Sequence, residues 1–269
     1  CAVYFGSPGE TNSISVKTLD SQNNVEYAKI AVNATSAKYL QNEYSVITKL
    51  SELEFVHFHL PEILGIERLA SMSILTQNSL GEAGLKQAPY NAGLALLISK
   101  EISIKKSNCQ KLMKANYFLE LSDRVKATGI DWLKQAISQI EQDYGECELL
   151  FGLNHGDFTP WNILQDGKRI YVIDWEWSRP SVPVGYDLCH YEHQSAHNLN
   201  IAKKSLPYES GSLINLLNSL AVDETLAPLI YALYAIDWIC FEILESRKHI
   251  DTLGSHSHAL CLVIRELKK

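Results

Sequence analysis

The sequence has 269 residues, of which 46% are hydrophobic and 20% are charged, and its formal net charge is −7 at neutral pH. Such a chain can bury a sizeable core in one or two domains, and its acidic balance without blocks of like charge argues against nucleic-acid and anionic-membrane partners. No apolar run approaches the length of a membrane span, and the six cysteines lack paired spacing, so we expect a cytoplasmic protein with reduced thiols. Because the sequence opens on Cys1 without a signal-peptide pattern, we expect it to be N-terminally incomplete or renumbered.

The N-terminal region predicts a small antiparallel sheet with one helix. Short apolar or alternating runs between turn residues predict five strands, at residues 2–5, 14–19, 25–32, 61–67 and 71–76. Between the third and fourth strands, Thr35 and Ser36 are the candidate N-cap residues of a helix that runs to about Leu53. A polar break at residues 76–79 follows the sheet, which predicts one domain over residues 1–78 and a second over residues 79–269.

The second region is mainly helical in pattern. Apolar residues recur at three- and four-residue spacing in six segments, at residues 91–104, 111–121, 131–144, 213–220, 226–244 and roughly 257–267. Polar runs at residues 165–169 and at Arg179-Pro180 predict turns. No internal repeat or low-complexity tract interrupts the pattern, so we expect one larger and mostly helical domain.

A set of polar side chains lies at loop and strand ends in the middle of this region. A loop that begins at His155 carries Asp157 and Asn162, and a hairpin with an Asp-Gly turn then brings Asp174 to the end of its second strand. Phosphoryl transfer needs one carboxylate to orient an attacking hydroxyl, and a carboxylate with an amide to hold Mg²⁺ against the phosphates. Asp157 and Asn162 have the spacing of the kinase catalytic loop, and Asp174 follows where the metal-binding Asp of a kinase would lie. The segment therefore predicts a kinase-like active site.

These residues resemble the aminoglycoside phosphotransferase and choline kinase family of small-molecule kinases. Its members carry His-Gly-Asp-x-x-x-x-Asn and then Ile-Asp-Trp/Phe-Glu, which correspond to residues 155–162 and 173–176. A third segment, residues 183–188, resembles the family's Gly-x-Pro-x-x-Asp-Leu. The resemblance implies an α+β, protein-kinase-like fold of two lobes: a small N-lobe with a five-stranded antiparallel sheet and one helix, and a larger, mainly helical C-lobe.

The resemblance also implies roles for the matched residues, with ATP and Mg²⁺ as cofactors. Asp157 would be the catalytic carboxylate, and Asn162 and Asp174 would be the Mg²⁺ ligands. His155 would brace the catalytic loop rather than act as a base, because Asp157 already fills that role. Asp187 would support the same loop from its own segment.

A lysine and a glutamate of the N-lobe are expected to act as a pair. Lys29 lies where the third-strand lysine of a kinase would bind the α- and β-phosphates, and Lys17 is the alternative, with a surface position as its simpler interpretation. Glu43 lies beside the apolar face of the predicted helix and could hold Lys29 towards the nucleotide. Glu52 and Glu54 are the alternatives nearer the helix end.

Two N-lobe segments are further candidates for nucleotide binding. Gly6, Ser7 and Gly9 lie between the first two strands, where a kinase has its glycine-rich loop, although they lack the full G-x-G-x-x-G pattern. Their backbone N–H groups and hydroxyl could contact phosphate oxygens. Thr76 and Asn78 lie in the polar break, where the hinge backbone of the family would bind an adenine.

Other residues near the predicted site have two interpretations each. Glu176 and Trp177 are candidates for substrate binding, and Glu176 could instead bind a second Mg²⁺. Trp161, Trp175 and Tyr186 could stack on a sugar or an ammonium group, or they could pack in the core around the loop.

Three histidines share one helical face after this segment. His190, His193 and His197 have a spacing that a zinc site would allow, but a solvated or capped helix face explains them more simply.

The sequence therefore predicts an ATP-dependent phosphotransferase with an alcohol group as acceptor. Its partner would be a small polar molecule with a hydroxyl group, of the aminoglycoside, sugar or amino-alcohol type. Two alternatives are a protein kinase, for which residues 178–186 leave little room for an activation segment, and an inactive kinase-like module that binds a nucleotide or a partner. The incomplete glycine loop is the feature that favours the inactive module.

Overall fold

The computed structural model describes residues 2–5, 13–19, 25–80, 85–198, 212–220 and 224–245, and the contacts between its Cα atoms divide the chain into two units. The first unit comprises residues 1–91 and 155–178, and the second comprises residues 92–154 and 179–269. The segment 155–178, which carries the predicted catalytic residues, therefore packs with the N-terminal region. The predicted boundary after residue 78 divides the chain by role rather than by packing, and it stays a prediction.

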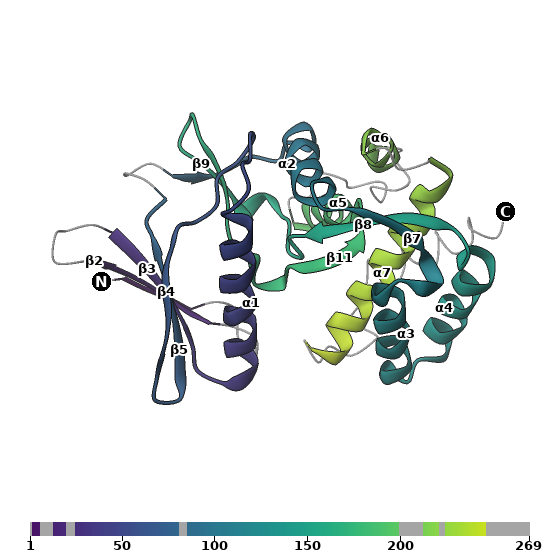
Figure 1. Cartoon of the computed structure of the whole chain (residues 1–269), viewed down its shortest axis with the longest axis horizontal. Coiled ribbons are helices and arrows are strands. Elements are labelled where there is room, and N and C mark those ends of the chain that lie inside the picture. The colour runs from purple at the N-terminus through teal and green to yellow at the C-terminus, as the bar shows by residue number, and fades with distance from the viewer. Residues whose placement is uncertain are drawn as a thin grey trace. The chain divides into compact units, whose positions relative to one another are not determined.

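Five strands form an antiparallel sheet in the first unit, as predicted (Figure 1). They are β1 (Ala2–Phe5), β2 (Ile14–Leu19), β3 (Val25–Ala31), β4 (Ile63–Leu69) and β5 (Met72–Asn78), and they lie in the order β1-β2-β3-β5-β4. The predicted end of the last strand at Thr76 is wrong. β5 continues to Asn78 because it keeps pairing with β3 as far as the Glu26–Asn78 pair.

The helix α1 (Ala34–Leu50) begins and ends slightly earlier than predicted. Its N-cap is Asn33 rather than Thr35 or Ser36, since Asn33 Oδ1 accepts a hydrogen bond of 2.8 Å from the Ser36 backbone N–H. The Ser36 hydroxyl in turn lies 3.4 Å from the Asn33 backbone nitrogen, which completes a reciprocal cap. Asparagine caps a helix as well as serine or threonine does, so three neighbouring residues offered the same signal.

The core of the first unit lies between α1 and the sheet. Ala31 of β3, Leu40 of α1 and Leu75 of β5 are fully buried against one another, with Tyr44 and Ile66 packed around them. Apolar residues on one stripe of α1 and on one face of the sheet produce this contact, which is what the helical and alternating periods predict.

A second, three-stranded sheet in the first unit contains the predicted hairpin that precedes Asp174. It consists of β6 (Lys86–Gln87), β9 (Ile163–Gln165) and β10 (Ile170–Val172), in the order β10-β9-β6. The predicted turn between β9 and β10 is present. Asp166 Oδ1 accepts hydrogen bonds from the backbone N–H groups of Lys168 and Arg169, at 3.1 and 2.9 Å. Two short 3₁₀ turns, η2 (Pro160–Asn162) and η3 (Trp175–Trp177), flank this hairpin.

The second unit combines helices with a three-stranded sheet. Its helices are α2 (Ala92–Ile104), α3 (Asn116–Thr128), α4 (Asp131–Tyr144), α5 (Tyr186–Asn198), α6 (Ser212–Ser219) and α7 (Ala227–Leu244), with single 3₁₀ turns η1 (Leu112–Lys114) and η4 (Glu224–Leu226). Its strands are β7 (Asn108–Lys111), β8 (Glu148–Asn154) and β11 (Arg179–Pro183), in the order β11-β8-β7. Four of the six predicted helices are confirmed to within a residue or two. The one predicted at residues 257–267 lies outside the described residues.

Two predictions in the second unit are wrong. The helix expected at residues 111–121 is replaced by the end of β7, the turn η1 and then α3, because Lys111 pairs with Glu148 of β8. The turn expected at Arg179-Pro180 is the start of β11, where Arg179 pairs with Asn154. Pro180 has no N–H to donate, and the pairing is irregular there and resumes at Val182.

The helix α7 is more apolar than the sequence analysis allowed. Among the described helices it alone has the length and composition of a membrane span, so the statement that no apolar run approaches that length was wrong. Two thirds of this segment, 67%, is nevertheless buried inside the structure, where it packs against α3 and α5. Burial on nearly all sides accounts for an apolar composition all round the helix.

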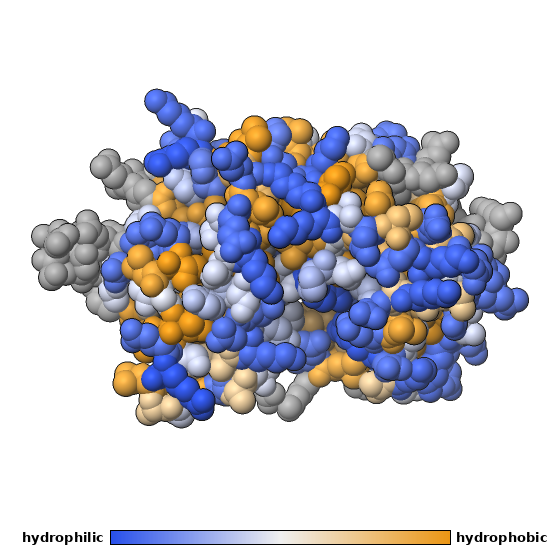
Figure 2. Space-filling model, viewed as in Figure 1, coloured by the Kyte–Doolittle hydropathy of each residue, from blue (hydrophilic) through white to orange (hydrophobic). Residues whose placement is uncertain are grey.

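Large apolar side chains are exposed singly rather than in one patch. Figure 2 shows hydrophobic and hydrophilic residues interspersed on the face in view. The exposed large apolar residues among those described are Val3, Val32, Val56, Leu64, Leu69, Leu97 and Leu119. Scattered exposure of this kind is usual for a folded protein.

We expect Gly152→Ala to destabilise the second unit. β8 passes so close to the end of α2 that a Cβ atom at Gly152 would overlap the backbone carbonyl of Ser103. Backbone lies on both sides of the overlap, so α2 and β8 must shift apart, at a cost of about 1–3 kcal/mol. Urea unfolding should show this loss, whereas Gly65→Ala in β4, with nothing within 4 Å of the added Cβ, is the matched control. Equal losses in both variants would contradict the proposed overlap.

A buried ionic network joins four elements of the second unit. Asp237 of α7 is 2% exposed, and its carboxylate accepts hydrogen bonds from Arg179 at 2.5 Å, from the Tyr186 hydroxyl at 2.9 Å and from Arg124. Burial alone would raise the pKa of the Asp237 carboxyl, but Arg179 and Arg124 outweigh burial and hold this pKa below its usual value. The network thereby ties the first residue of β11 to α3, α5 and α7.

The lowered pKa predicts an acid-dependent part of the stability. A carboxyl whose pKa is lower in the folded than in the unfolded chain stabilises the fold above its unfolded pKa of about 4. This contribution is lost as the pH falls from there through the folded pKa. Asp237→Asn should therefore lower the unfolding free energy by about 3–5 kcal/mol at neutral pH, because Arg179 loses the counter-charge of Asp237 and Arg124 keeps only that of Glu245.

The difference between wild type and Asp237→Asn should shrink below about pH 4, where the wild-type carboxylate also takes up a proton. Urea unfolding at neutral and acidic pH measures it. Asp123→Asn on the exposed face of α3, where the side chain is 78% exposed, is the control and should change little. A difference that stays constant with pH would exclude this titration as the cause.

Candidate active site

The loop after His155 depends on a glycine at its second position. Gly156 has φ of +91°, which side chains larger than hydrogen rarely tolerate. A Cβ atom at Gly156 would also overlap the backbone carbonyl of Trp177 in η3. The His-Gly-Asp glycine therefore allows the loop to lie directly against the turn that follows Asp174.

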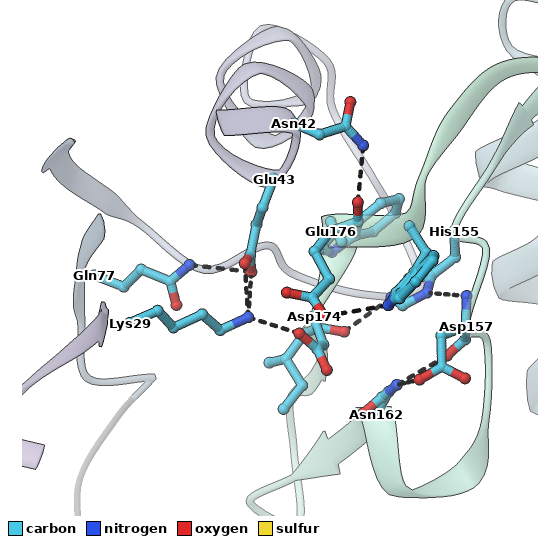
Figure 3. A network of polar contacts seen from close by, with 12 residues as sticks. Lys29, Asn42, Glu43, Gln77, His155, Asp157, Asn162, Asp174 and Glu176 are labelled. Carbon is cyan, nitrogen blue, oxygen red and sulfur yellow. Dashed lines mark hydrogen bonds and ion pairs between the residues drawn. The ribbon is translucent and has the colours of Figure 1, made fainter. Parts of the chain in front are cut away.

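Asn162 holds the carboxylate of Asp157. Its amide nitrogen Nδ2 donates to the Asp157 carboxylate oxygen Oδ2 at 2.9 Å and to the Asp157 backbone carbonyl at 2.8 Å (Figure 3). Asn162 is 6% exposed, on the last residue of η2, so it is a rigid support. Because both amide hydrogens face Asp157, Oδ1 of Asn162 is the atom that can serve a cation.

His155 connects the catalytic loop to the end of β10. Its Nε2 lies 2.8 Å from the carbonyl oxygen of Ile173, and its Nδ1 accepts the Asp157 backbone N–H at 3.3 Å. The ring is fully buried against Trp175, with ring centroids 4.6 Å apart. Both nitrogens are thus engaged in holding backbone, which supports a brace rather than a base.

Asp174 has an unusual backbone conformation. It follows β10 with φ of 71° and ψ of 57°, in the left-handed region that Asp and Asn enter more readily than other non-glycine residues. This conformation turns the chain directly into η3. The carboxylate, 35% exposed, is thereby brought to the Lys29 ammonium, 2.6 Å away.

The predicted pair of Lys29 and Glu43 is present. Lys29 Nζ lies 2.6 and 2.8 Å from the two carboxylate oxygens of Glu43, whose side chain is fully buried, and it also contacts Asp174 (Figure 3). Burial alone would lower the pKa of Lys29, but Asp174 and Glu43 raise it above its usual value, so the ammonium stays charged. Lys17, the alternative lysine, lies over the Tyr27 ring instead, 5.9 Å from its centroid.

A third carboxylate completes the cluster. Oxygens of Glu43, Asp174 and Glu176 all lie within 4.8 Å of one another. Burial, and next the charge of Asp174, raise the pKa of Glu176 to about 8. Carboxylate oxygens are the hard ligands that Mg²⁺ prefers, so these three carboxylates form a donor set that fits a Mg²⁺ ion.

The remaining nucleotide-site candidates have different outcomes. Gly6, Ser7 and Gly9 lie outside the described residues. Thr76 lies within β5, and Asn78 ends it, with its amide donating to the Glu62 carboxylate at 2.7 Å. Their predicted nucleotide contacts stay predictions.

Asp187 lies in the first turn of α5 in the second unit and is 3% exposed. Its predicted role as a support of the catalytic loop is likewise untested and stays a prediction.

The aromatic residues around the site are mostly structural. Trp175 is fully buried, and its indole N–H donates to the Val172 carbonyl at 2.9 Å. Trp177 packs against Tyr39 of α1, with centroids 4.3 Å apart, and its N–H donates to Glu176. Tyr186 belongs to the buried network of the second unit. Core packing is therefore the correct interpretation for Trp175.

The expectation of a solvated histidine face on α5 is wrong for His190 and His193, whereas the side chain of His197 lies outside the described part of the chain. His190 is fully buried and His193 is 2% exposed. Their Nδ1 atoms lie 3.3 Å from the Tyr234 hydroxyl and 3.0 Å from the Tyr231 hydroxyl of α7. The two histidines therefore line the contact between α5 and α7.

Two side chains of the site were missed in the sequence. Gln77 donates to Glu43 at 3.3 Å from the buried face of β5, and its alternation with buried Leu75 was the available signal. Asn42 of α1 donates to backbone carbonyls around η3, and no sequence pattern marks it.

The fold is similar to that of solved phosphotransferases and small-molecule kinases. Solved structures similar to this chain include an aminoglycoside phosphotransferase in a ternary complex with AMP-PNP and hygromycin B, with a TM-score of 0.65, 13% identity, and 98% of this chain and 93% of that chain covered. Choline kinase from Streptococcus pneumoniae is similar with a TM-score of 0.63 and 13% identity. The match covers 100% of this chain and 93% of that chain. A Plasmodium vivax ethanolamine kinase has a TM-score of 0.63, 15% identity, and 99% and 83% coverage. These likenesses confirm the predicted α+β, protein-kinase-like fold class.

The family comparison is more specific. A family model described as the phosphotransferase enzyme family matches residues 109–190, which include all three motifs of the sequence. The predicted resemblance to the aminoglycoside phosphotransferase and choline kinase family is therefore confirmed over this segment, and the description of the family model agrees with the predicted enzyme class, a phosphotransferase. No curated protein matches the sequence.

Proposed function

We propose that this chain transfers the γ-phosphate of ATP to a hydroxyl group of a small polar molecule. The observation that carries the proposal is the chain of contacts from Glu43 through Lys29 to Asp174, together with the Asn162–Asp157 contact in the same unit. A fixed cation, a metal-binding carboxylate and a positioned second carboxylate are the parts that phosphoryl transfer requires.

Each side chain has one role in the proposed reaction. Asp157, held by Asn162, accepts or orients the proton of the acceptor hydroxyl, whose oxygen forms the new bond to phosphorus. Lys29, held by Glu43, binds the α- and β-phosphates. Asp174 and Asn162 would hold Mg²⁺, which would supply positive charge against the negative charge of the phosphates as ADP leaves.

The remaining predicted roles are part of the same proposal. Residues 1–78 would form the nucleotide-binding lobe. In this lobe, Gly6, Ser7 and Gly9 would contact the phosphates, and Thr76 and Asn78 would contact the adenine. Residues 79–269 would hold the catalytic loop and the acceptor. Trp177 would contact the acceptor, Glu176 would contact the acceptor or share a divalent cation with Asp174, and His155 and Asp187 would brace the loop. A cytoplasmic location would supply ATP and Mg²⁺.

The acceptor is proposed as a class rather than as one compound. The similar structures include enzymes named for choline, ethanolamine and aminoglycosides, which are amino alcohols or amino sugars. We therefore expect an acceptor of the aminoglycoside, sugar or amino-alcohol type. Pocket shape decides among such acceptors, and this makes a broad panel the appropriate test.

The test measures ATP consumption by the purified protein, with Mg²⁺, across a panel of these acceptors. Turnover that needs the acceptor, and a product that gains one phosphoryl group by mass spectrometry, would support the proposal. The matched control for each active acceptor is its deoxy analogue, and a second control replaces Mg²⁺ with EDTA. Mg²⁺-ATP binding without turnover on any acceptor would favour an inactive kinase-like module, and absence of nucleotide binding by the folded protein would refute the proposal.

A further inference from the structure

One face of α1 contacts the turn that follows Asp174. Asn42 Nδ2 donates to the backbone carbonyl of Glu176 at 3.0 Å (Figure 3). It also donates to the backbone carbonyl of Ser178 at 2.9 Å. One helical turn earlier, Tyr39 packs against the Trp177 ring, with centroids 4.3 Å apart. Residues three apart in a helix lie on the same face, so these two side chains hold η3 together.

The next residue of α1 holds the lysine. Glu43 is fully buried and contacts Lys29 Nζ at 2.6 Å. Consecutive positions of one rigid helix thus support both sides of the carboxylate cluster: Asn42 supports the backbone that carries Glu176, and Glu43 supports Lys29, which contacts Asp174.

The contacts of Asn42 suit it to this purpose. The carboxamide nitrogen carries two hydrogens, and each can satisfy one of the two carbonyl oxygens at the end of η3. At the end of η3, the Ser178 N–H donates to the Trp175 carbonyl at 3.1 Å. η3 is only three residues long and follows a residue in the left-handed region, so the two bonds from Asn42 add outside support to its shape.

We propose that Asn42 is a positioning residue for the metal-binding carboxylates. By fixing η3 to α1, Asn42 keeps Asp174 and Glu176 at the spacing from the Lys29–Glu43 pair at which their oxygens can share one divalent cation. Asn42 contacts backbone only, so its effect on a cation passes through these carboxylates. The inference rests on the proposed function for its kinetic readout, and it also predicts a metal-binding effect that does not depend on turnover.

The test replaces Asn42 with leucine, which has a similar shape and no donor. The Mg²⁺ concentration for half-maximal rate at saturating ATP should rise about tenfold, the effect expected when hydrogen bonds that hold the metal ligands are lost. The rate at saturating Mg²⁺ should return close to the wild-type value. Gln41→Leu is the matched control, because it removes a carboxamide from the neighbouring, exposed position of α1. If circular dichroism shows that Asn42→Leu is not folded, Asn42→Ala takes its place.

A second measurement separates this inference from the proposed function. Mn²⁺ binding to the protein with AMP-PNP, followed through the relaxation of solvent water protons, should weaken by a similar factor in Asn42→Leu and not in Gln41→Leu. Weakened Mn²⁺ binding in a protein that phosphorylates no acceptor would support the inference while the proposed function fails. Unchanged metal dependence, with a lower rate at every Mg²⁺ concentration or a lower melting temperature alone, would show that Asn42 is merely structural and overturn the inference. Absence of Mn²⁺ binding to the wild type would overturn it as well.

Discussion

Asp157→Asn should lower kcat by about 10²–10⁴-fold, the usual contribution of a positioned general base. The asparagine keeps the size of the side chain and an oxygen that can still accept a hydrogen bond from Asn162 Nδ2. In the wild type, this nitrogen lies 2.9 Å from the Asp157 carboxylate. It removes the charge and basicity that would orient and receive the hydroxyl proton. Steady-state kinetics with the active acceptor measure the loss, and nucleotide binding by calorimetry should stay close to that of the wild type.

Asp166→Asn is the control for this change. Asp166 lies in the turn of the same hairpin and pairs with Arg169 at 2.7 Å, so the same chemical replacement is made in the same segment. Its rate should stay near that of the wild type. An Asp157→Asn enzyme with a wild-type kcat would show that Asp157 is not the catalytic carboxylate.

Asp174→Asn should lower kcat/KM for ATP by about 10²–10³-fold, the effect of removing one group that stabilises charge in the transition state. Asparagine is the best available replacement, because it tolerates the left-handed backbone of Asp174 nearly as well as aspartate does. The variant therefore tests the charge of the metal ligand with little change in the fold. Its Mg²⁺ requirement should rise along with the loss of rate.

Two further measurements make this prediction specific. Unfolding by urea should show that Asp174→Asn is folded, although Lys29 loses one of its two carboxylate contacts. Raising Mn²⁺ or Mg²⁺ should recover part of the rate in Asp174→Asn but not in Asp157→Asn, because only the first change affects a metal ligand. Equal behaviour of the two variants would argue against separate catalytic and metal-binding roles.

Local patterns predicted most of the regular structure correctly. Alternation in β2 and β3 and the three- and four-residue spacing in α4 and α7 were sufficient, because each element is amphipathic or buried as its own period requires. Local patterns failed at β7, β8 and β11. Lys111 of β7 pairs with Glu148 of β8, and Arg179 of β11 pairs with Asn154 of β8, so each strand depends on a partner more than twenty residues away in the sequence.

For the candidate site, too, local sequence patterns predicted some features and missed others. The spacing of Asp157, Asn162 and Asp174 was readable because a loop and a hairpin place these residues within one local segment. The helix boundary at Asn33 and the choice among neighbouring cap residues depended on one backbone conformation that the sequence does not specify.

The sequence by itself predicted the class of chemistry, since the order and spacing of the motif residues 155–162 and 173–176 indicate their proposed roles. Only the tertiary structure decided which side chains complete the site. Lys29 contacts Glu43, 14 residues away in the sequence, and Asp174, 145 residues away. The periodicity of a helix or a strand does not predict contacts at such separations. The physical reason is that a buried ammonium is stable only beside carboxylates that the fold brings to it, and α1 supplies Glu43 to Lys29 and Asn42 to the turn after Asp174.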